Sequence, residues 1–149
     1  MLETWIPRLG VRGVVVADDE AARSPLARAA MTLCVPPEVP VRIVPLVELD
    51  AAALAALPEP VLVLVRDVAG LVEATRHGLA PTTARRLNLG NVHYSPGRKA
   101  VTPSVFITAE ELAQLQALAA AGFEVEARAI PSDAPAGIEQ LVRAFRAAK

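Results

Sequence analysis

The sequence predicts an α/β fold with an open, mostly parallel β-sheet and helices on both faces. Short apolar runs alternate along the chain with segments of helical periodicity, as in repeated βα units. The run Val61–Val65 (VLVLV) has no polar position, which is typical of a parallel strand covered on both faces. The last helical segment has an apolar stripe at the spacing of a helix packed on a sheet: Ile138, Leu141, Val142 and Phe145.

Length and composition place narrow limits on the class of protein. At 149 residues we expect one domain, residues 1–149, with a single core of Val, Leu, Ile and Ala, because aromatic residues make up only 3%. The net charge of −1 argues against a nucleic-acid partner, which would need a basic face. No apolar run reaches the ~18 residues of a membrane span, and MLETWIPR lacks the basic start of a signal peptide. We therefore expect a cytoplasmic protein, in which the single Cys34 is a small buried hydrophobe.

The first βα unit is predicted from residue 11 onward. Val11–Ala17 is apolar enough for a strand that is buried on both faces. Asp18 and Asp19 follow it and can cap a helix from about Glu20 to Leu33. Pro25 is tolerated only in the first turns of that helix, or else it shifts the start of the helix.

Two further βα units follow. Val41–Val44 is predicted to be a strand, and Leu46–Leu57 a helix rich in alanine. Val61–Val65 is the next strand. Asp67 can then cap a helix whose apolar residues recur at helical spacing until the helix ends near Gly78.

A polar loop, Asn88–Thr102, interrupts this regular pattern. It begins in the apolar run Leu87–Leu89, contains a Pro-Gly turn, and carries the cations Arg98 and Lys99. Such a loop could bind an anion or could be an ordinary solvated connection. Its glycines do not have the spacing of a phosphate-cradling loop, and the chain has no G-x-G-x-x-G fingerprint.

The rest of the chain predicts two more strands and two more helices. Ser104–Ile107 is a short strand, and Thr108–Glu111 has the residues of a capping box that begins a helix. Phe123–Ile130 alternates apolar and polar residues at first, which suits a strand nearer the edge of the sheet. Ser132 or Asp133 is predicted to cap the final helix.

In such a fold, ligands bind where the carboxyl ends of the strands meet. The polar residues that the sequence places near this edge are Asp18, Asp19, Arg66, Asp67, Asn91, His93, Arg128, Ser132 and Asp133. The Asp and Ser residues could equally be helix caps, Arg66 a solvated charge, and His77 a surface residue at a helix end. Arg128 is suited to hold a phosphate, or it could pair with a neighbouring carboxylate. No metal site and no cofactor are predicted.

Several stretches together resemble the IIB subunits of the mannose/fructose/sorbose class of bacterial sugar phosphotransferase systems. They occur in the same order as in that family and span nearly the whole chain: LETWIPRLG with Trp5, VVVADDEAARSPL (Val14–Leu26), CVPPEV (Cys34–Val39), LNLGN and PGRK (Leu87–Lys99), and AGFEVEARAIPSD (Ala121–Asp133).

The resemblance implies a phosphocarrier. Family members accept a phosphoryl group on a histidine from a phosphorylated IIA protein and pass it to a sugar carried by the membrane subunits IIC and IID. It implies a cytoplasmic protein associated peripherally with that membrane complex, able to form homo-oligomers and needing no cofactor. Arg128 matches a family arginine that would stabilise the phosphohistidine. Asp18, Asp19, Asn91, His93 and Ser132 are expected to support the site.

One departure from the family concerns the acceptor. In the family it lies in a motif like R-x-D-x-R-L-x-H-G-Q-V after the first strand, and Met1 aligns with the final valine. We therefore expect the first strand of the family fold and the acceptor histidine upstream of Met1, and no transfer activity in the chain as written. Three hypotheses follow: a phosphocarrier whose start is assigned too late, an acceptor-less regulatory or interaction module that binds IIA or IIC/IID, or an unrelated small-anion-binding α/β domain.

Overall fold

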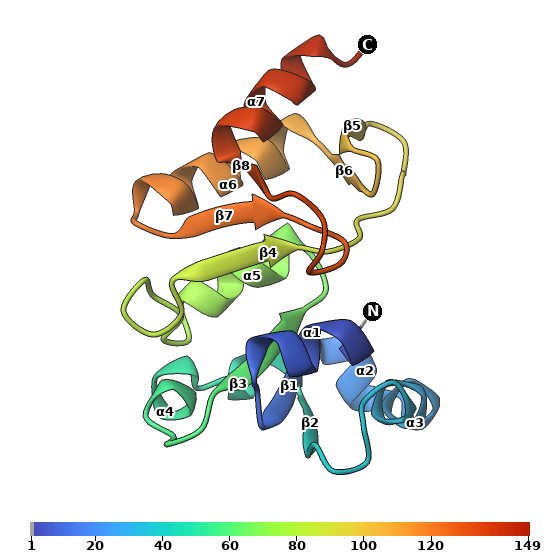
Figure 1. Cartoon of the computed structure of the whole chain (residues 1–149), viewed down its shortest axis with the longest axis vertical. Coiled ribbons are helices and arrows are strands. Elements are labelled where there is room, and N and C mark those ends of the chain that lie inside the picture. Colours follow the sequence, from blue (N-terminus) through green and yellow to red (C-terminus); the bar gives the residue numbers. More distant parts are fainter. Residues whose placement is uncertain (1) are drawn as a thin grey trace. The chain divides into compact units, whose positions relative to one another are not determined.

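The computed structural model describes residues 2–149 and confirms the predicted α/β class. The chain divides into two compact units, Met1–Leu79 and Ala80–Lys149, which are blue to green and green to red in Figure 1. Each unit has its own parallel strands and its own helices. That residues 1–149 act as one domain stays a prediction.

The sheet of the first unit has three parallel strands. Their order is β2 (Val41–Val44), β1 (Gly13–Ala17) and β3 (Val61–Val65), so β1 is in the middle. In this register Val15 lies beside Arg42 on one side and beside Val63 on the other. All five residues of β1 are buried, as its apolar sequence predicts.

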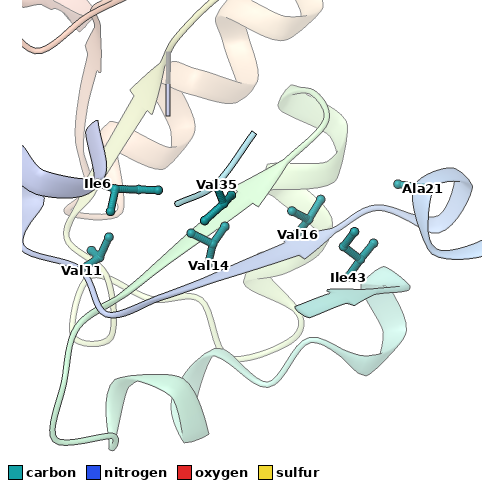
Figure 2. Close-up of a cluster of buried hydrophobic side chains, with 7 residues drawn as sticks. All are labelled: Ile6, Val11, Val14, Val16, Ala21, Val35 and Ile43. Carbon is teal, nitrogen blue, oxygen red and sulfur yellow. The ribbon is translucent and has the colours of Figure 1, made fainter. Parts of the chain in front are cut away.

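One face of this sheet is covered by the first three helices: α1 (Leu2–Leu9), α2 (Asp19–Arg23) and α3 (Pro25–Leu33). Figure 2 shows the resulting core, in which side chains from β1 and β2 meet side chains from α1, α2 and the loop after α3. Its buried members are Ile6, Val11, Val14, Val16, Ala21, Val35 and Ile43.

The predicted helix over residues 20–33 is in fact two helices. Ser24 ends α2, and its hydroxyl accepts a hydrogen bond from Ala27 N–H (3.1 Å), which begins α3. Pro25 occupies the first turn of α3, where its missing N–H costs nothing. A shift of the helix start at Pro25 was one of the two predicted outcomes. The helix α1 was not predicted.

The opposite face of the sheet carries the 3-10 turn η1 (Leu46–Glu48), α4 (Ala51–Ala55) and α5 (Val68–Thr75). The predicted continuous helix over 46–57 is wrong. Asp50 accepts a hydrogen bond from Ala53 N–H (3.0 Å), so its side chain begins a new helix in the middle of the predicted one.

The prediction that Cys34 is buried is also wrong. Cys34 is exposed, and it ends α3, a helix with no fully buried residue. Leu26 and Leu33 on the same helix are 81% and 86% exposed, and within the run Met31–Val35 only Val35 is fully buried. An apolar stretch indicates burial only when its helix packs closely on a core, and α3 rests on the core mainly through Ala27 and Met31.

β3 is an edge strand among residues 2–149, because β1 is its only strand partner in the described sheet. Each of its five residues is partly exposed. Its continuous apolar sequence predicts a strand covered on both faces. The partial exposure of all five residues differs from that prediction.

The second unit contains a mixed sheet and a hairpin. The mixed sheet has the order β4 (Arg86–Leu89), β7 (Glu124–Ala127) and β8 (Ala136–Gly137); β4 and β7 are parallel, and β8 is antiparallel. The hairpin pairs β5 (Lys99–Thr102) with β6 (Val105–Ile107). The helices of this unit are α6 (Ala109–Ala120) and α7 (Ile138–Ala147).

Two predictions for the second unit need correction, and one is confirmed. The capping box is present: Thr108 accepts from Glu111 N–H, and the Glu111 carboxylate accepts from Thr108 N–H. The predicted strand over 123–130 covers only Glu124–Ala127, and it lies in the middle of its sheet because the two-residue β8 pairs with its outer side. Neither Ser132 nor Asp133 caps α7, which begins after Gly137.

Candidate functional site

Asp18 directly follows β1 at the carboxyl edge of the first unit. Its Oδ1 accepts hydrogen bonds from the backbone N–H groups of Glu20 (2.9 Å) and Ala21 (3.1 Å), so Asp18 caps α2 as predicted. The residue is only 7% exposed. This burial alone would raise the pKa of Asp18, but the Ala21 N–H and the guanidinium of Arg66 outweigh it, and the pKa lies below its ordinary value.

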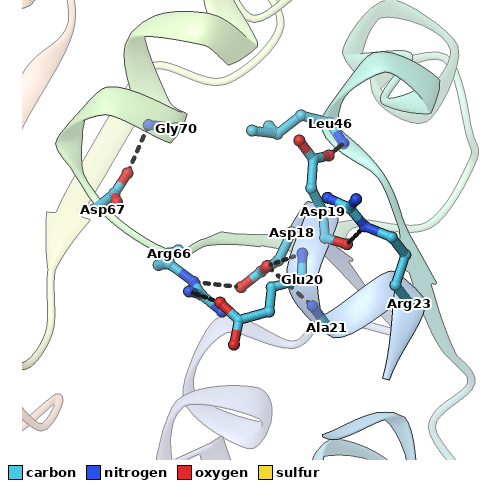
Figure 3. Close-up of polar contacts among 9 residues, drawn as sticks. All are labelled: Asp18, Asp19, Glu20, Ala21, Arg23, Leu46, Arg66, Asp67 and Gly70. Atoms are coloured by element: carbon cyan, nitrogen blue, oxygen red, sulfur yellow. Dashed lines mark hydrogen bonds and ion pairs between the residues drawn. The ribbon is translucent and has the colours of Figure 1, made fainter. Parts of the chain in front are cut away.

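Arg66 directly follows β3 and lies beside Asp18 at the same edge, as Figure 3 shows. Its Nε donates to Asp18 Oδ2 (2.9 Å), and its Nη1 pairs with the carboxylate of Glu20. The side chain is half exposed, yet it is held by a buried carboxylate, so reading it as only a solvated charge is wrong. The hydrogen bond to Asp18 raises the pKa of Arg66 above its already high ordinary value.

The other two aspartates of this edge hold the backbone in place. The Asp19 carboxylate accepts a hydrogen bond from Leu46 N–H (2.8 Å), which ties the start of α2 to η1. The Asp67 carboxylate accepts from Gly70 N–H (2.8 Å) and caps α5 (Figure 3). The helix-cap prediction is confirmed for Asp67 and wrong for Asp19, which lies inside α2 and bonds a distant backbone N–H instead.

A hollow of about 360 Å³ opens between these groups. Four carboxylates and two guanidinium groups line it, which leaves a formal charge of −2: Asp18, Asp19, Glu20 and Asp67 against Arg23 and Arg66. A field of this sign repels a phosphate dianion unless further cations are present. Taken by itself, this hollow is suited to cations or neutral polar groups and not to phosphate.

Arg128 directly follows β7 at the carboxyl edge of the second unit. Its backbone N–H donates to Asn88 Oδ1 (3.0 Å), and its carbonyl accepts from Asn88 Nδ2 (3.1 Å), so one side chain of β4 fixes the backbone of Arg128. Its Nη2 and Nε both donate to Oε1 of Glu126, at 2.5 and 3.1 Å. Its Nη1 also donates to the carbonyl of Pro131 (3.4 Å) in the turn after the strand. The side chain is 19% exposed, and these contacts hold it at the edge of the sheet.

The remaining predicted residues of this edge lie in the connections after β4 and β7. Because Leu89 pairs with Ala127, the segment with Asn91 and the segment that begins at Arg128 leave the sheet side by side. His93 and Ser132 are both exposed. The Asp133 carboxylate accepts from the N–H groups of Ala129 and Ile130, both at 3.2 Å, so it stabilises the turn after β7 instead of capping α7.

The loop with His93 is anchored through a cation. Arg98 donates to the backbone oxygen of His93 (3.1 Å) and pairs with Glu111 (2.7 Å), the residue that completes the capping box of α6. Lys99 lies over the ring of Phe145 and donates to the carbonyl of Ala148 (3.0 Å). The two cations of this polar loop are thus engaged in the fold of the second unit, which favours the reading of the loop as a structural connection.

His77, the other histidine, lies just beyond α5 and is 23% exposed. Its Nε2 is 3.4 Å from Glu73, and its carbonyl accepts from Ala51 N–H. Within residues 2–149, no three Asp, Glu, His or Cys side chains are grouped so that they could hold a metal ion. No helix in the same range is long and apolar enough to cross a membrane.

Sequence reasoning missed the roles of Glu20 and Asn88. Arg66 lies 46 and 48 residues from its two partners, and Asn88 lies 40 residues from Arg128, so no local pattern joins them. Only the predicted order of strands in the sheet could have indicated these contacts. Arg66 and Asp18 each follow an apolar run directly, and adjacent parallel strands bring such positions together.

Comparisons with known proteins agree over nearly the full length of the chain. A family model described as the sorbose-subfamily IIB component of the PTS matches residues 2–149. The chain is 25% identical over 139 residues to the N-acetylgalactosamine-specific phosphotransferase enzyme IIB component 2 of Escherichia coli, covering 93% of this chain and 87% of that protein. It is 22% identical over 148 residues to the fructose-specific EIIB component of Bacillus subtilis, covering 96% and 87%. The IIBSor domain of the Klebsiella pneumoniae sorbose permease has the same fold, with a TM-score of 0.81, 21% identity and coverage of 95% and 86%.

Proposed function

The chain belongs to the sorbose subfamily of IIB components of sugar phosphotransferase systems, and on this premise we propose that it relays a phosphoryl group from a phosphorylated IIA protein to a sugar. The observation that carries the proposal is the family match over all of residues 2–149. The sugar would be held by the membrane subunits IIC and IID, with which this chain would associate from the cytoplasmic side. Family membership removes the hypothesis of an unrelated anion-binding domain.

The relay requires a histidine acceptor. In the transfer from IIA, the phosphorus–nitrogen bond of the donor breaks while a new bond forms to the acceptor's imidazole nitrogen, so that nitrogen must lie in line with the phosphorus. In the transfer to the sugar, the phosphorus–nitrogen bond of the acceptor breaks while a sugar hydroxyl oxygen attacks the phosphorus and gives up its proton. His77 lies just beyond α5 with its Nε2 3.4 Å from Glu73, and His93 lies in an exposed loop; neither matches the position of the family's acceptor. We therefore propose that the acceptor is carried by residues that precede Leu2.

The free edge of β3 supports this placement of the acceptor. Of the two apolar strands of the first unit, β1 has partners on both sides, whereas β3 has one among the described residues. A further parallel strand along Val61–Val65 would pair its open backbone groups and cover its partly exposed side chains. The connection leaving the carboxyl end of that strand would then begin beside Arg66.

Arg128 is the residue that we propose for phosphate binding. Its guanidinium group is held at a sheet edge by one carboxylate, and an arriving phosphate could exchange with Glu126 on the same nitrogen atoms. We also propose that Asp18, Asp19, Asn91, His93 and Ser132 are supporting residues of the site.

A second candidate function is an acceptor-less regulatory or interaction module that binds IIA or IIC/IID. The observation that supports it is that neither His77 nor His93 lies at the position of the family's acceptor. In that case the carboxyl edge would recognise a partner without receiving a phosphoryl group.

Labelling with phosphorylated IIA tests the relay. Residues 1–149 should remain unlabelled, and the same protein extended by the codons upstream of Met1 should acquire one acid-labile phosphohistidine in the added segment. Stoichiometric label on His93 would refute the assignment of the acceptor. An in-frame stop directly upstream of Met1, together with IIA binding by the unlabelled chain, would favour the regulatory module.

A further inference from the structure

A second hollow lies at the other end of the strands of the first unit, lined by residues of α4 and of the amino ends of β1, β2 and β3. We call it the amino-edge groove. Its volume is about 320 Å³, and Leu54, Leu57 and Val61 supply apolar walls. Leu57 is 50% exposed, so its side chain borders the groove without filling it.

The groove exists because of one missing side chain. Gly13 begins the central strand, and its face of the sheet is the one that α4 covers. A Cβ placed on Gly13 would meet only Val61 Cγ2 at 3.7 Å and the carbonyl of Pro40 at 3.8 Å, which are ordinary van der Waals distances. Gly13 is therefore not required for close packing here, and its lack of a side chain leaves room in the groove.

Two arginines line the groove. Arg12 precedes Gly13, and Arg42 lies opposite Val15 on β2. Both are exposed, and neither forms an ion pair or a side-chain hydrogen bond with any of residues 2–149. Glu59 is the one acidic residue among the lining groups, so the groove has a formal charge of +1. Arg66 and Arg128, by contrast, are both bonded to carboxylates.

We propose that the amino-edge groove binds a small monocarboxylate with a short apolar tail. The tail would lie over Gly13 against Leu54 and Leu57, and the carboxylate would accept hydrogen bonds from Arg12 and Arg42. Ligand pockets range from about 300 to 1,000 Å³, so a groove at the lower limit suits one short chain. The site lies at the end of β1 and β3 opposite to Asp18 and Arg66, so it is independent of the proposed phosphoryl relay.

Titration with octanoate tests the proposal. In methyl-detected NMR, octanoate should shift the signals of Leu54, Leu57 and Val61, while the methyl signals of Leu112, Leu115 and Leu141 in the second unit stay fixed. Octanol, which lacks the charge, should bind at least about tenfold more weakly, the loss expected for one charge-assisted hydrogen bond. Equal affinity for octanoate and octanol, or no shifts up to the solubility limit, would overturn it.

Three variants sharpen the test. Gly13→Val should fill the groove and abolish octanoate binding, since valine suits a strand and its Cβ has room. Arg12→Gln with Arg42→Gln should weaken octanoate binding by about tenfold or more without changing octanol binding. Arg8→Gln, an exposed arginine on α1 outside the groove, is the matched charge control and should bind octanoate like the unaltered protein. If the double variant binds as tightly as this control, the arginines do not form the site and the proposal fails.

Discussion

Arg66 and Arg128 occupy equivalent places in the two units, yet their partners differ. Each arginine directly follows a parallel strand and is bonded to a carboxylate. The carboxylate partners of Arg66 include the buried Asp18, which belongs to the neighbouring strand end. Arg128 is bonded instead to Glu126 on its own strand and to the carbonyl of Pro131 in the turn that follows. An arginine that joins two strand ends supports the fold. An arginine held by its own strand could exchange that carboxylate for another anion at little structural cost.

The charged groups around the two arginines also differ. Arg66 lies in a hollow with a formal charge of −2, and its Asp18 partner is also the cap of α2. Arg128 is bonded to one carboxylate, and its backbone is fixed by Asn88. If Arg128 binds phosphate as we propose, the origin of an arginine's partner distinguishes such a residue better than its position at the carboxyl edge.

The largest expected effect is on the rate of phosphoryl transfer. In a protein that includes the acceptor histidine, Arg128→Ala should slow phosphoryl transfer from IIA about 100-fold, the typical cost of losing one preorganised donor to a transition-state oxyanion. Arg128→Lys should be intermediate, because it keeps the charge and loses the planar fork. Rapid-quench assays with labelled IIA would measure both rates.

Arg66→Ala is the comparison for that experiment and should slow transfer by a smaller factor than Arg128→Ala, because Arg66 acts on the proposed site only through its bond to Asp18. A normal rate in Arg128→Ala, or equal losses in the two alanine variants, would remove the distinction between the two arginines.

The next effect is on stability. Asp18→Ala should lower the free energy of unfolding by about 2 kcal/mol, the upper end of the range for a lost helix cap, since it also removes the partner of Arg66. Glu126→Ala, which removes the partner of Arg128, should cost about 0.5 kcal/mol. Urea unfolding measures the free energy of unfolding of both variants. Equal losses of that free energy would show that the two ion pairs contribute equally to stability.

The smallest expected effect is on the change of the free energy of unfolding with pH. The pKa of Asp18 is lower in the folded protein than its ordinary value, so its ionised form stabilises the fold above the unfolded-state pKa. That contribution disappears as the pH falls through the lower, folded-state pKa. The unaltered protein should therefore lose stability below about pH 4 more steeply than Asp18→Asn, which still caps α2 but does not titrate. Parallel acid slopes in chemical unfolding at pH 2–6 would contradict this role of Asp18.

Much of the fold could be predicted because its causes are local. The apolar run Val61–Val65 forms a strand wherever it is placed in such a sheet. Thr108 and Glu111 are three residues apart and cap their helix through their own backbone groups. The position of Asp18 just beyond a strand follows from a short pattern of the same kind, whereas Arg128 was predicted near the end of a strand that in fact stops at Ala127. The sequence by itself thus determined the α/β class, most strands and the candidate residues of the carboxyl edges.

Only the tertiary structure decided which of those residues meet. The bond between Arg66 and Asp18 depends on the parallel register of β1 and β3, which brings together residues 48 positions apart. The exposure of Cys34 depends on how closely α3 packs on the core, and the amino-edge groove depends on where α4 lies over Gly13. Hydrogen bonds and burial between distant segments arise from packing. The periodicity of one segment does not indicate which other segments pack against it.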